Sequence, residues 1–421
     1  MLTMPGSPGF SWSATLFCLC VFGLVGVLVV AAAEKTAAVG DKRAEDVEEG
    51  LAPSLTAAAA PKGAMVEAPS KAGIKEAASA SYIDVTQYCT ADPSHVRKWK
   101  LTQQALCQAI QALVDQKLTV LYFPVGTYDC ASETILIDFS AIFPDSTAAT
   151  AAYQHLRNGM SWRGEGQNSS VSLGDQTGRG APAFWVRWSS PPSGRISADV
   201  FYWEFTGLNF SGSADNVLVQ IGGSDPNEMP FNSCIVDVAV NNGYKAPQDG
   251  GIGPARGLEL VRFLQSRLNV VGTSATGIGT IFNTCEFCTL LSGSFSNAQR
   301  TVGKSADCPT GVRVCKGVGL YLQDCASLNL LNINCEVAYD GIELTGSTIG
   351  ILFGTIVSNN CDYDGSVLVL SDDLKTTSRN TVHMLLRRNT RQYTGGMFQT
   401  AVRGSKDRVA TCLTISTDLT R

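Results

Sequence analysis

Four residues near the C-terminal end of the chain have the spacing that a repeating structure would give to an acid–base site. Asp340, Asp362 and His383 follow one another at nearly equal intervals, and Asp364 follows Asp340 at a similar one. In a structure that repeats with this period, such side chains stack on one face, about 4.8 Å apart. Stacked carboxylates repel each other, which raises one pKa and separates a proton donor from a base. The spacing therefore predicts catalytic roles for all four, with the histidine assisting proton transfer.

Paired carboxylates are typical of enzymes that cleave glycosidic bonds. Retaining enzymes hold the two groups about 5 to 5.5 Å apart, and inverting enzymes hold them farther apart. Asp372 and Asp373 in "SDDLK" are a further candidate pair, or residues that bind the substrate. The alternative for these aspartates is a turn, in which the side chain bonds its own backbone. The alternative for His383 is a packed strand residue.

The end of the chain is basic, although the net charge of the whole chain is −5. Nine Lys or Arg residues lie from Lys375 onward, opposed only by Asp407 and Asp418. Arginine clamps carboxylates with two hydrogen bonds, so this region suits an anionic glycan. Arg387 is then a candidate base or charge stabiliser of a lyase, and Arg388 a candidate substrate ligand. A solubilising basic tail is the alternative.

Two tryptophans are candidates for stacking on sugar rings. Trp185 lies in "AFWVRWSS" and Trp203 in "FYWEF", each within a short apolar run. The alternative for both is packing beneath a sheet edge. No metal site is predicted: "DYDG" at 362–365 lacks the downstream acidic ligand of a complete calcium loop. Calcium therefore enters only as a cofactor that a lyase would need.

The elements that would position these residues are short strands. From about residue 200, apolar runs alternate with Gly, Asn and Ser turns, and the runs that follow a glycine start at Gly257, Gly277, Gly317 and Gly341. The steps are nearly equal, except for one longer step that contains "CPTGVRVC" (308–315). A period of roughly 20 to 24 residues with several strands and no helix is typical of a parallel β-solenoid, in which each coil covers the next. We therefore predict an all-β fold, a parallel β-helix.

The open end of such a stack needs a cap. In the 101–116 stretch, Leu106, Ile110, Leu113 and Val114 recur on one face at helical spacing. We predict an N-terminal capping helix here, followed by the first strands in "TVLYFPVGTYDC" (119–130).

The helix "ALCQAIQALVDQ", the "TVLYFPVGTYDC" segment and "MSWRGEGQNSSVSL" (160–173) resemble the N-terminal module of the pectate-lyase superfamily. The resemblance covers about residues 97–175, and the coil periodicity extends it to about 385. One departure is "SHVRKWKLTQQ" (94–104), which replaces the acidic stretch usual before the family's capping helix. The resemblance implies a right-handed β-helix that acts on a polysaccharide.

The reaction is not identified by the resemblance, because a fold does not determine its chemistry. The catalytic signatures of the polygalacturonase-like and alginate-epimerase branches are absent from the sequence. Two classes of function remain: a lyase, hydrolase or epimerase acting on a neutral or acidic polysaccharide, and a non-catalytic protein that binds glycan or serves as a surface scaffold. The acid–base spacing favours the enzyme.

The N-terminal part of the chain predicts export. The uncharged run at 14–33 ends in three alanines, which favours a cleaved signal peptide at 1–33, while its length suits an uncleaved anchor. Residues 34–80 lack aromatic residues and are rich in Ala, Pro, Glu and Lys, which predicts a flexible linker. The folded domain is then 81–421, secreted or tethered to a surface, with the membrane a partner only through an uncleaved 14–33 segment.

Cysteines and charge complete the prediction. Of the fourteen cysteines, Cys18 and Cys20 lie in the apolar segment, and export makes disulfides or buried thiols the expected state of the rest. Asn168 and Asn209 head glycosylation sequons, which predicts surface positions. The mild net charge, without a basic–aromatic motif, argues against a nucleic-acid partner.

Overall fold

The computed structural model describes residues 81–190, 199–244, 255–296, 317–336, 340–359, 368–370, 381–388, 402–403 and 412–417. The predicted signal segment at 1–33 and linker at 34–80 lie outside these residues, as does the 308–315 loop. No helix within the described ranges combines the length and the hydropathy of a membrane span.

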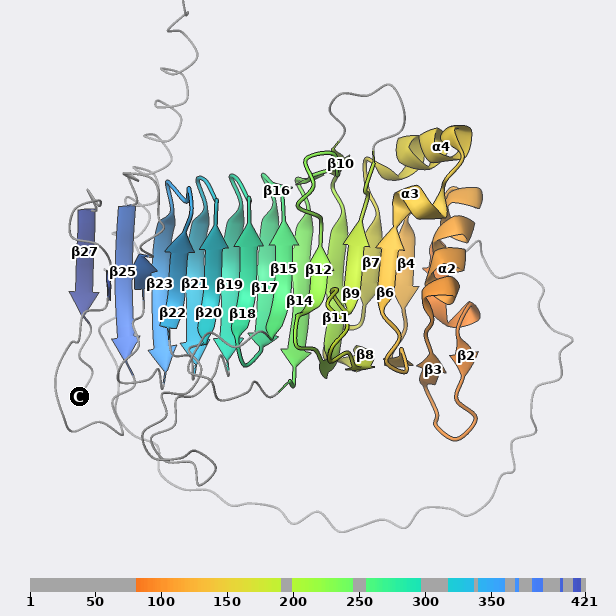
Figure 1. Cartoon of the computed structure of the whole chain (residues 1–421), viewed down its shortest axis with the longest axis horizontal. Helices are drawn as coiled ribbons and strands as arrows, with labels where there is room; N and C mark the ends of the chain where they lie inside the picture. Colours follow the sequence, from red (N-terminus) through yellow and green to blue (C-terminus); the bar gives the residue numbers. More distant parts are fainter. Residues whose placement is uncertain are drawn as a thin grey trace, which may run out of the picture. The chain divides into compact units, whose positions relative to one another are not determined.

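The described chain is predominantly β, as predicted, and its strands form three sheets (Figure 1). The nine-stranded sheet contains β6 (Ile135–Asp138), β9 (Phe184–Arg187), β12 (Val217–Ile221), β15 (Arg256–Val261), β18 (Ile278–Asn283), β20 (Val318–Gln323), β22 (Asp340–Thr345), β24 (Leu368–Leu370) and β26 (Val402–Arg403). The three-stranded sheet contains β10 (Val200–Phe201), β13 (Phe231–Asn232) and β16 (Phe263–Leu264).

The largest sheet has fifteen strands in the described ranges. Its main path is β2 (Thr90–Ala91), β3 (Lys98–Lys100), β5 (Gly126–Asp129), β8 (Ser169–Asp175), β11 (Glu204–Ser213), β14 (Ile235–Asn242), β17 (Arg267–Ser274), β19 (Thr289–Ser296), β21 (Asn329–Glu336), β23 (Leu352–Asn359), β25 (Thr381–Arg388) and β27 (Cys412–Thr417). Beside this path pair β1 (Ile83–Asp84), β4 (Val120–Phe123) and β7 (Ser161–Gly164).

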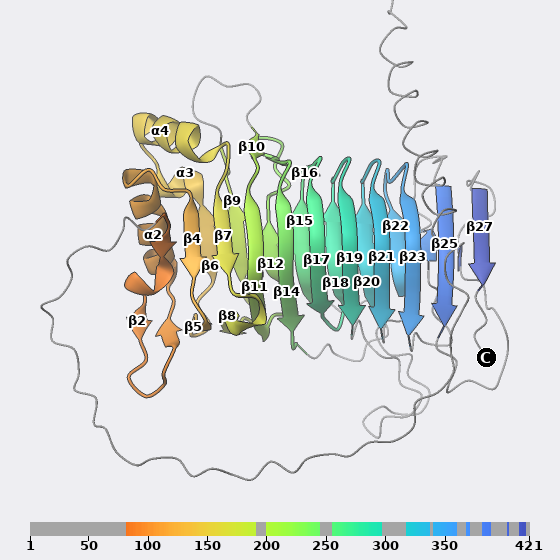
Figure 2. The same ribbon diagram turned by 180° about the vertical axis from the view of Figure 1, so that it is seen from behind.

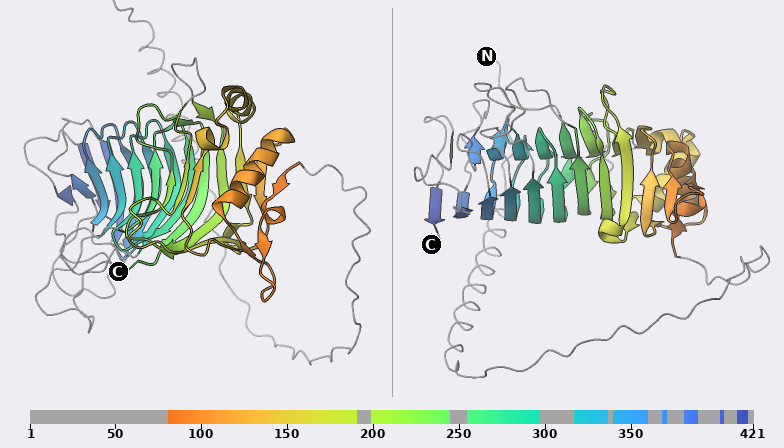
Figure 3. Two further views of the ribbon diagram at one scale, coloured as in Figure 1. Left: turned by 45° about the vertical axis from the view of Figure 1, so that its right-hand side comes forward. Right: turned by 90° about the horizontal axis from the view of Figure 1, so that it is seen from below.

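The chain runs through the sheets in a fixed order. We define a pass as the stretch from one strand of the nine-stranded sheet to the next strand of that sheet. After β12 the chain enters β13 and then β14 before it returns to the nine-stranded sheet as β15, and the next pass repeats the order. Strands that neighbour each other in a sheet therefore come from successive passes and pair in parallel; among the described pairs only β2 and β3 are antiparallel. Figure 2 shows these strands side by side in chain order, and the right-hand view of Figure 3 shows two facing rows.

The core lies between the sheets because side chains of a strand alternate between its two faces. In β9, Phe184 and Val186 are buried in the main core, so Trp185 and Arg187 lie on the opposite, outer face. Rings from successive passes stack inside: the centroids of Phe231 and Phe263 are 5.2 Å apart. Each pass thus covers apolar surface that the previous pass leaves open.

The turn that follows β15, β18, β20 and β22 repeats the same backbone conformation, and we call it the corner. Two residues in each corner adopt positive φ: Thr284 and Phe287 after β18, and Asp324 and Ser327 after β20. Between them, Leu264, Glu286, Ala326 and Ile349 form single parallel bridges from pass to pass. The corners of successive passes therefore lie in register, residue above residue.

A row of glycines aligns the passes, and two of its members are not the glycines at which the apolar runs of the sequence start. Strand pairing stacks Gly257, Gly279, Gly319 and Gly341, so the second glycine of "GIG" and of "GVG" occupies the row, not Gly277 or Gly317. A Cβ on Gly257 or Gly279 would lie 2.5 Å from the carbonyl oxygen of the next glycine in the row. Only glycine allows this close approach.

The predicted capping helix is present as α2 (Gln103–Asp115). Thr102 begins it, because its side chain accepts a hydrogen bond from the Ala105 amide. Leu106, Ile110 and Leu113 are fully buried against the first strands, β1, β4 and β6, whereas Val114 is only half-buried. The other helices in the described ranges are α3 (Phe139–Ile142), α4 (Ser146–Leu156) and the 3-10 turns η1 (Val85–Gln87) and η2 (Gly166–Asn168).

Candidate functional site

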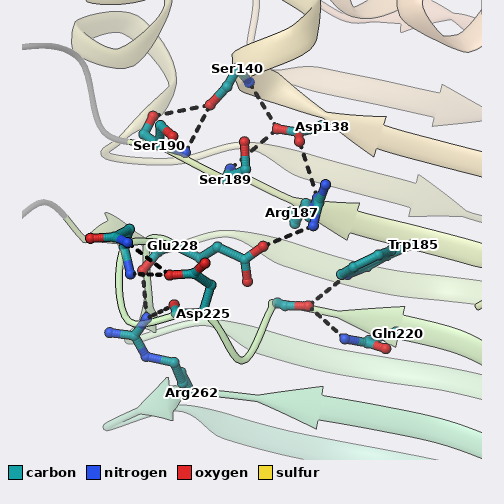
Figure 4. A network of polar contacts seen from close by, with 12 residues as sticks. Asp138, Ser140, Trp185, Arg187, Ser189, Ser190, Gln220, Asp225, Glu228 and Arg262 are labelled. Carbon is teal, nitrogen blue, oxygen red and sulfur yellow. Dashed lines mark hydrogen bonds and ion pairs between the residues drawn. The ribbon is translucent and has the colours of Figure 1, made fainter.

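The candidate site is a network of charged and polar side chains on the outer side of the nine-stranded sheet (Figure 4). It joins the ends of β6 and β9 to the loop between β12 and β13. Three charged side chains form its centre: Asp138, Arg187 and Glu228. We call these three the acid–arginine cluster.

Asp138 is fixed by three hydrogen bonds. It ends β6 and begins α3, and its Oδ1 accepts from the amides of Ser140 (3.1 Å) and Ser189 (3.2 Å). Its Oδ2 accepts from Arg187 Nε at 3.1 Å. Because α3 and β9 both donate to it, this carboxylate has one fixed position, and it is 7% exposed.

Arg187 joins the two carboxyl groups. Its Nη1 donates to Glu228 Oε1 at 3.0 Å while its Nε holds Asp138. Its Cζ lies 4.1 Å from the centroid of the Trp185 ring, an arrangement in which a guanidinium is attracted to an aromatic face. Trp185 is fixed in turn, since its Nε1 donates to the Gly222 carbonyl at 2.8 Å.

Glu228 is the residue of the cluster whose environment is least compatible with a charge. It is 5% exposed, and its Oε2 is buried without a hydrogen-bond partner among the described residues. Burial raises the pKa of Glu228 above the ordinary value of 4.5, and the attraction of Arg187 only partly opposes the shift. A Cβ at Gly223 would overlap this carboxyl group, so glycine at 223 makes room for it. Glu228 is therefore suited to hold and release a proton.

The loop that carries Glu228 is tied down by the next pass. Arg262 Nη1 donates to the carbonyl oxygens of Glu228 (2.6 Å), Asp225 (2.9 Å) and Pro226 (3.4 Å). Arg262 is itself the first residue of the corner after β15, with φ 57°. The position of Glu228 thus depends on three successive passes.

A row of polar and aromatic side chains continues from Trp185 along the outer face. Strand register places next to one another Trp185, Gln220, Glu259, Ile281, Tyr321 and Glu343. Trp185, Tyr321 and Glu343 are half-buried, whereas Gln220 and Glu259 are 9% exposed. Asn283 supports the row by donating to Glu259 at 3.2 Å. Ile281, which is 3% exposed and packs with Tyr321, interrupts the row, so its polar groups lie on either side of an apolar position.

Two members of the sequence-predicted column, Asp340 and His383, lie in strands of different sheets. Asp340 starts β22 in the nine-stranded sheet, whereas His383 lies in β25 of the fifteen-stranded sheet. The pairing of β22 with β24 aligns Ile342 with Leu368, so the step between these two strands is longer than the predicted one. One pass contains strands of different sheets, and a constant spacing therefore does not guarantee a shared face.

The roles predicted for the C-terminal residues stay predictions. Only the backbone of Asp340, His383, Arg387 and Arg388 is described, and Arg387 and Arg388 pair with Val357 and Ser358 of β23. The remaining candidates lie outside the described residues: Asp362, Asp364, Asp372 and Asp373. Within the described ranges no group of three metal-ligating side chains is present.

One of the two tryptophan candidates lies on the surface and the other lies in the core. Trp185 is on the outer face and can meet a ligand. Trp203 is fully buried among Phe139, Phe205 and Phe231, and its Nε1 donates to the Leu156 carbonyl at 2.8 Å. This position corresponds to the packing alternative, because no sugar reaches a fully buried ring.

The expected disulfides are not present in the described part of the chain. Its eight cysteines with described side chains are reduced: Cys89, Cys107, Cys130, Cys234, Cys285, Cys288, Cys325 and Cys335. Six of them are buried, which is the other state that the sequence allowed. The two sequons differ: Asn168 is exposed in η2, while Asn209 is half-buried within β11.

The acid–arginine cluster was missed by sequence reasoning because its members are far apart in the chain. Glu228 lies 41 residues after Arg187, and Arg187 lies 49 after Asp138. The one local signal is an arginine two residues after a tryptophan in a strand that is otherwise apolar, "FWVR". Alternation places both on one face.

No family model and no curated protein matches this sequence. Solved structures give weak likenesses. A protein of Geobacillus virus E2 (ORF18) is 13% identical with a TM-score of 0.34, over 80% of this chain and 61% of that one. The A-module of mannuronan C-5 epimerase AlgE6 from Azotobacter vinelandii is 10% identical (TM-score 0.32, 80% and 100% covered), and the Agl-KA catalytic domain is 11% identical (0.26, 82% and 69%). At TM-scores this low, the likenesses carry no argument about this chain.

Proposed function

We propose that this protein binds a polysaccharide along the outer face of the nine-stranded sheet and cleaves it with Glu228 as the proton donor. The observation that carries the proposal is the acid–arginine cluster: two carboxyl groups share one arginine beside an aromatic ring, and one carboxyl oxygen has no partner among the described residues. Two carboxyl groups in unlike environments are the usual basis of acid–base division at a glycosidic bond.

The division of roles follows from the two environments. Glu228 has a raised pKa, so it retains its proton to a higher pH than an ordinary glutamate and can donate it to a leaving oxygen. Asp138 acts only as an acceptor for its three donors and suits the role of the charged partner. Arg187 keeps the two groups at a fixed separation.

Binding of the glycan would use the outer row. The ring of Trp185 gives an apolar platform, and Gln220 and Glu259 give hydrogen-bonding groups from the next two passes, with Glu343 three passes beyond Glu259. Because each pass adds one position about 4.8 Å farther along, an extended polymer suits this row better than a compact ligand.

We further infer that the passes form a right-handed parallel β-helix of the pectate-lyase type and that the chain is exported, by a signal at 1–33 or an anchor at 14–33. The fixed order of sheets and the parallel pairing support the first inference.

Alternative catalytic residues in the C-terminal part remain Asp340, Asp362, Asp364, His383 and Arg387, with calcium as the cofactor if the reaction is an elimination.

A non-catalytic glycan-binding or scaffold protein is the second candidate. It is favoured by the hydrogen bonds of Arg187 and Arg262, which join the 222–229 loop to the sheet and would be useful without any reaction. A buried ion pair can serve to fix one conformation.

The test is a glycan panel incubated with the purified protein, with calcium or with chelator. Neutral glucans, alginate and polygalacturonate would be read for new reducing ends and for the absorbance of unsaturated products. Reducing ends that are lost in Glu228→Gln and Asp138→Asn support the proposal. Asp237→Asn is the matched control. Burial also raises the pKa of Asp237, but this residue lies in β14 of the fifteen-stranded sheet.

The outcomes separate the candidates. If unsaturated ends persist in Glu228→Gln, Glu228 is not the catalytic residue, and Arg387 and the other C-terminal candidates become the residues to test. Retention of a glycan without any product, by a folded protein, would overturn the enzyme and leave the binding protein.

A further inference from the structure

Two buried thiols lie one above the other in successive corners. Cys285 follows Thr284 in the corner after β18, and Cys325 follows Asp324 in the corner after β20. The next residues, Glu286 and Ala326, form a parallel bridge, and the Ala326 amide donates to the Cys285 carbonyl at 3.0 Å. The two cysteines are therefore nearest neighbours across the pass-to-pass spacing.

This spacing fits a disulfide. Neighbouring parallel strands are about 4.7 to 4.9 Å apart, which falls within the roughly 4.4 to 6.8 Å between the Cα atoms of linked cysteines. The thiols also point the same way: Cys285 Sγ donates to the Leu260 carbonyl (3.4 Å) and Cys325 Sγ to the Phe282 carbonyl (3.2 Å). Leu260 and Phe282 are themselves register partners. Both thiols are therefore directed at carbonyl oxygens that are neighbours across the same pass-to-pass spacing.

The neighbouring thiol is bound elsewhere. Cys288 lies in the same corner as Cys285, but its Sγ donates to the Phe263 carbonyl at 3.2 Å, on the far side of the bridge residue. Its counterpart on the next pass is Leu328, so Cys288 has no thiol above it. The geometry therefore singles out one pair.

We propose that Cys285 and Cys325 form a disulfide that joins two successive passes when the chain folds in the presence of a disulfide oxidant such as oxidised glutathione. One thiolate attacks a glutathione sulfur and releases one glutathione thiol, which leaves a mixed disulfide. The second cysteine attacks the protein sulfur and releases the other glutathione. The protein loses two protons and two electrons, and one glutathione disulfide becomes two thiols.

The disulfide must form while the chain folds, because the two thiols are not accessible in the folded protein. Cys285 and Cys325 are 1% and 0% exposed, and burial raises the pKa of Cys285 and lowers the fraction of reactive thiolate. An oxidant must therefore act before the corners pack. Once formed, the disulfide is equally shielded from reductants. The inference concerns β18–β21 and does not depend on the function proposed for the acid–arginine cluster.

The test refolds the whole chain with a glutathione redox buffer and, in parallel, with a reductant. Digestion without reduction, followed by mass spectrometry, should reveal a cross-linked pair of peptides that contain Cys285 and Cys325, two hydrogens lighter than the free peptides. The denaturant midpoint of the oxidised protein should exceed that of the reduced protein. This difference should vanish in Cys285→Ser and in Cys325→Ser.

Cys335→Ser is the matched control, because Cys335 is also buried but its register partners, Phe295 and Ser358, are not cysteines. It should keep the cross-link and the redox-dependent midpoint. Complete alkylation of both thiols in the oxidised, unfolded protein would overturn the proposal, as would a cross-link from Cys285 to Cys288. If a serine variant fails to fold, the mass measurement on the wild-type protein still shows whether the Cys285–Cys325 cross-link forms.

Discussion

Arg187 donates to one oxygen of Glu228 at 3.0 Å, and the other oxygen of the same carboxyl group is buried with no partner in the described structure. Half of this carboxyl group is therefore paired and half is available. A group that served only to hold the loop would gain from a second donor, since an unpaired buried oxygen costs about 1 to 3 kcal/mol. The unpaired Oε2 of Glu228 lowers stability, and it leaves an oxygen that could hold a proton or contact a ligand.

Replacement of Arg187 by Met should destabilise the protein more than the loss of one surface charge. It leaves Asp138 and Glu228 buried without their shared partner, so the free energy of unfolding should fall by roughly 3 kcal/mol. This is the low end for a broken buried pair, because the arginine side chain is 24% exposed. Urea denaturation measures the change.

Arg163→Met is the control for that substitution. Arg163 is exposed in β7, so the change should stay within about 0.5 kcal/mol. Equal effects of the two substitutions would show that the acid–arginine cluster contributes no more than an exposed charge.

The raised pKa of Glu228 predicts a pH dependence of stability. Between the ordinary value of 4.5 and the raised value, the folded chain binds more protons than the unfolded chain. The free energy of unfolding therefore falls as the pH rises through this window and no longer changes on account of Glu228 above it. Glu228→Gln removes the titrating group. The difference in unfolding free energy between wild type and this variant should change with pH from about 4 upward and then level off; a difference that is the same at every pH would contradict the raised pKa.

Much of the fold could be predicted because its signals are local. The apolar face of the 101–116 stretch is enough to identify α2, and apolar runs between glycines are enough to identify strands such as β18 and β20. The sequence places the start of one run at Gly277, whereas the stacked glycine is Gly279: "GIG" offers two glycines, and only the approach to the next carbonyl selects the second.

The site was harder to predict because its relationships are not local. A regular spacing related Asp340 to His383, yet a pass crosses several sheets and the two strands belong to different ones. Arg187 and Glu228 have no periodic relation, and a loop with "SDPNE" predicts only a turn. Which turn carboxylate becomes buried depends on Arg262 of the following pass.

The glycine row predicts a sharp difference between two substitutions in strands. In Gly279→Ala, the new Cβ would lie 2.5 Å from the Gly319 carbonyl oxygen, so the passes must separate locally and the protein should lose about 1 to 3 kcal/mol. Gly272→Ala meets no atom within 4 Å in β17 and should be near neutral or slightly stabilising. Thermal or urea denaturation compares them, and equal losses would mean that the close approach does not limit position 279.

The two tryptophans should separate stability from binding. Trp203→Ala removes a fully buried ring and should cost about 3 to 5 kcal/mol. Trp185→Ala removes a half-buried ring on the outer face, together with the contact to Arg187, so its cost should be nearer about 1 kcal/mol. Urea denaturation would give both values.

Glycan binding should show the opposite order. Affinity electrophoresis in gels that contain alginate or polygalacturonate should show retardation of wild type that Trp185→Ala loses while it stays folded. Trp203→Phe is the control that keeps a buried ring, and it should retain the retardation because its side chain never meets the ligand. If Trp185→Ala migrates like wild type in a gel that retards wild type, the outer row beside Arg187 is not the binding face, and the search would move to the fifteen-stranded sheet.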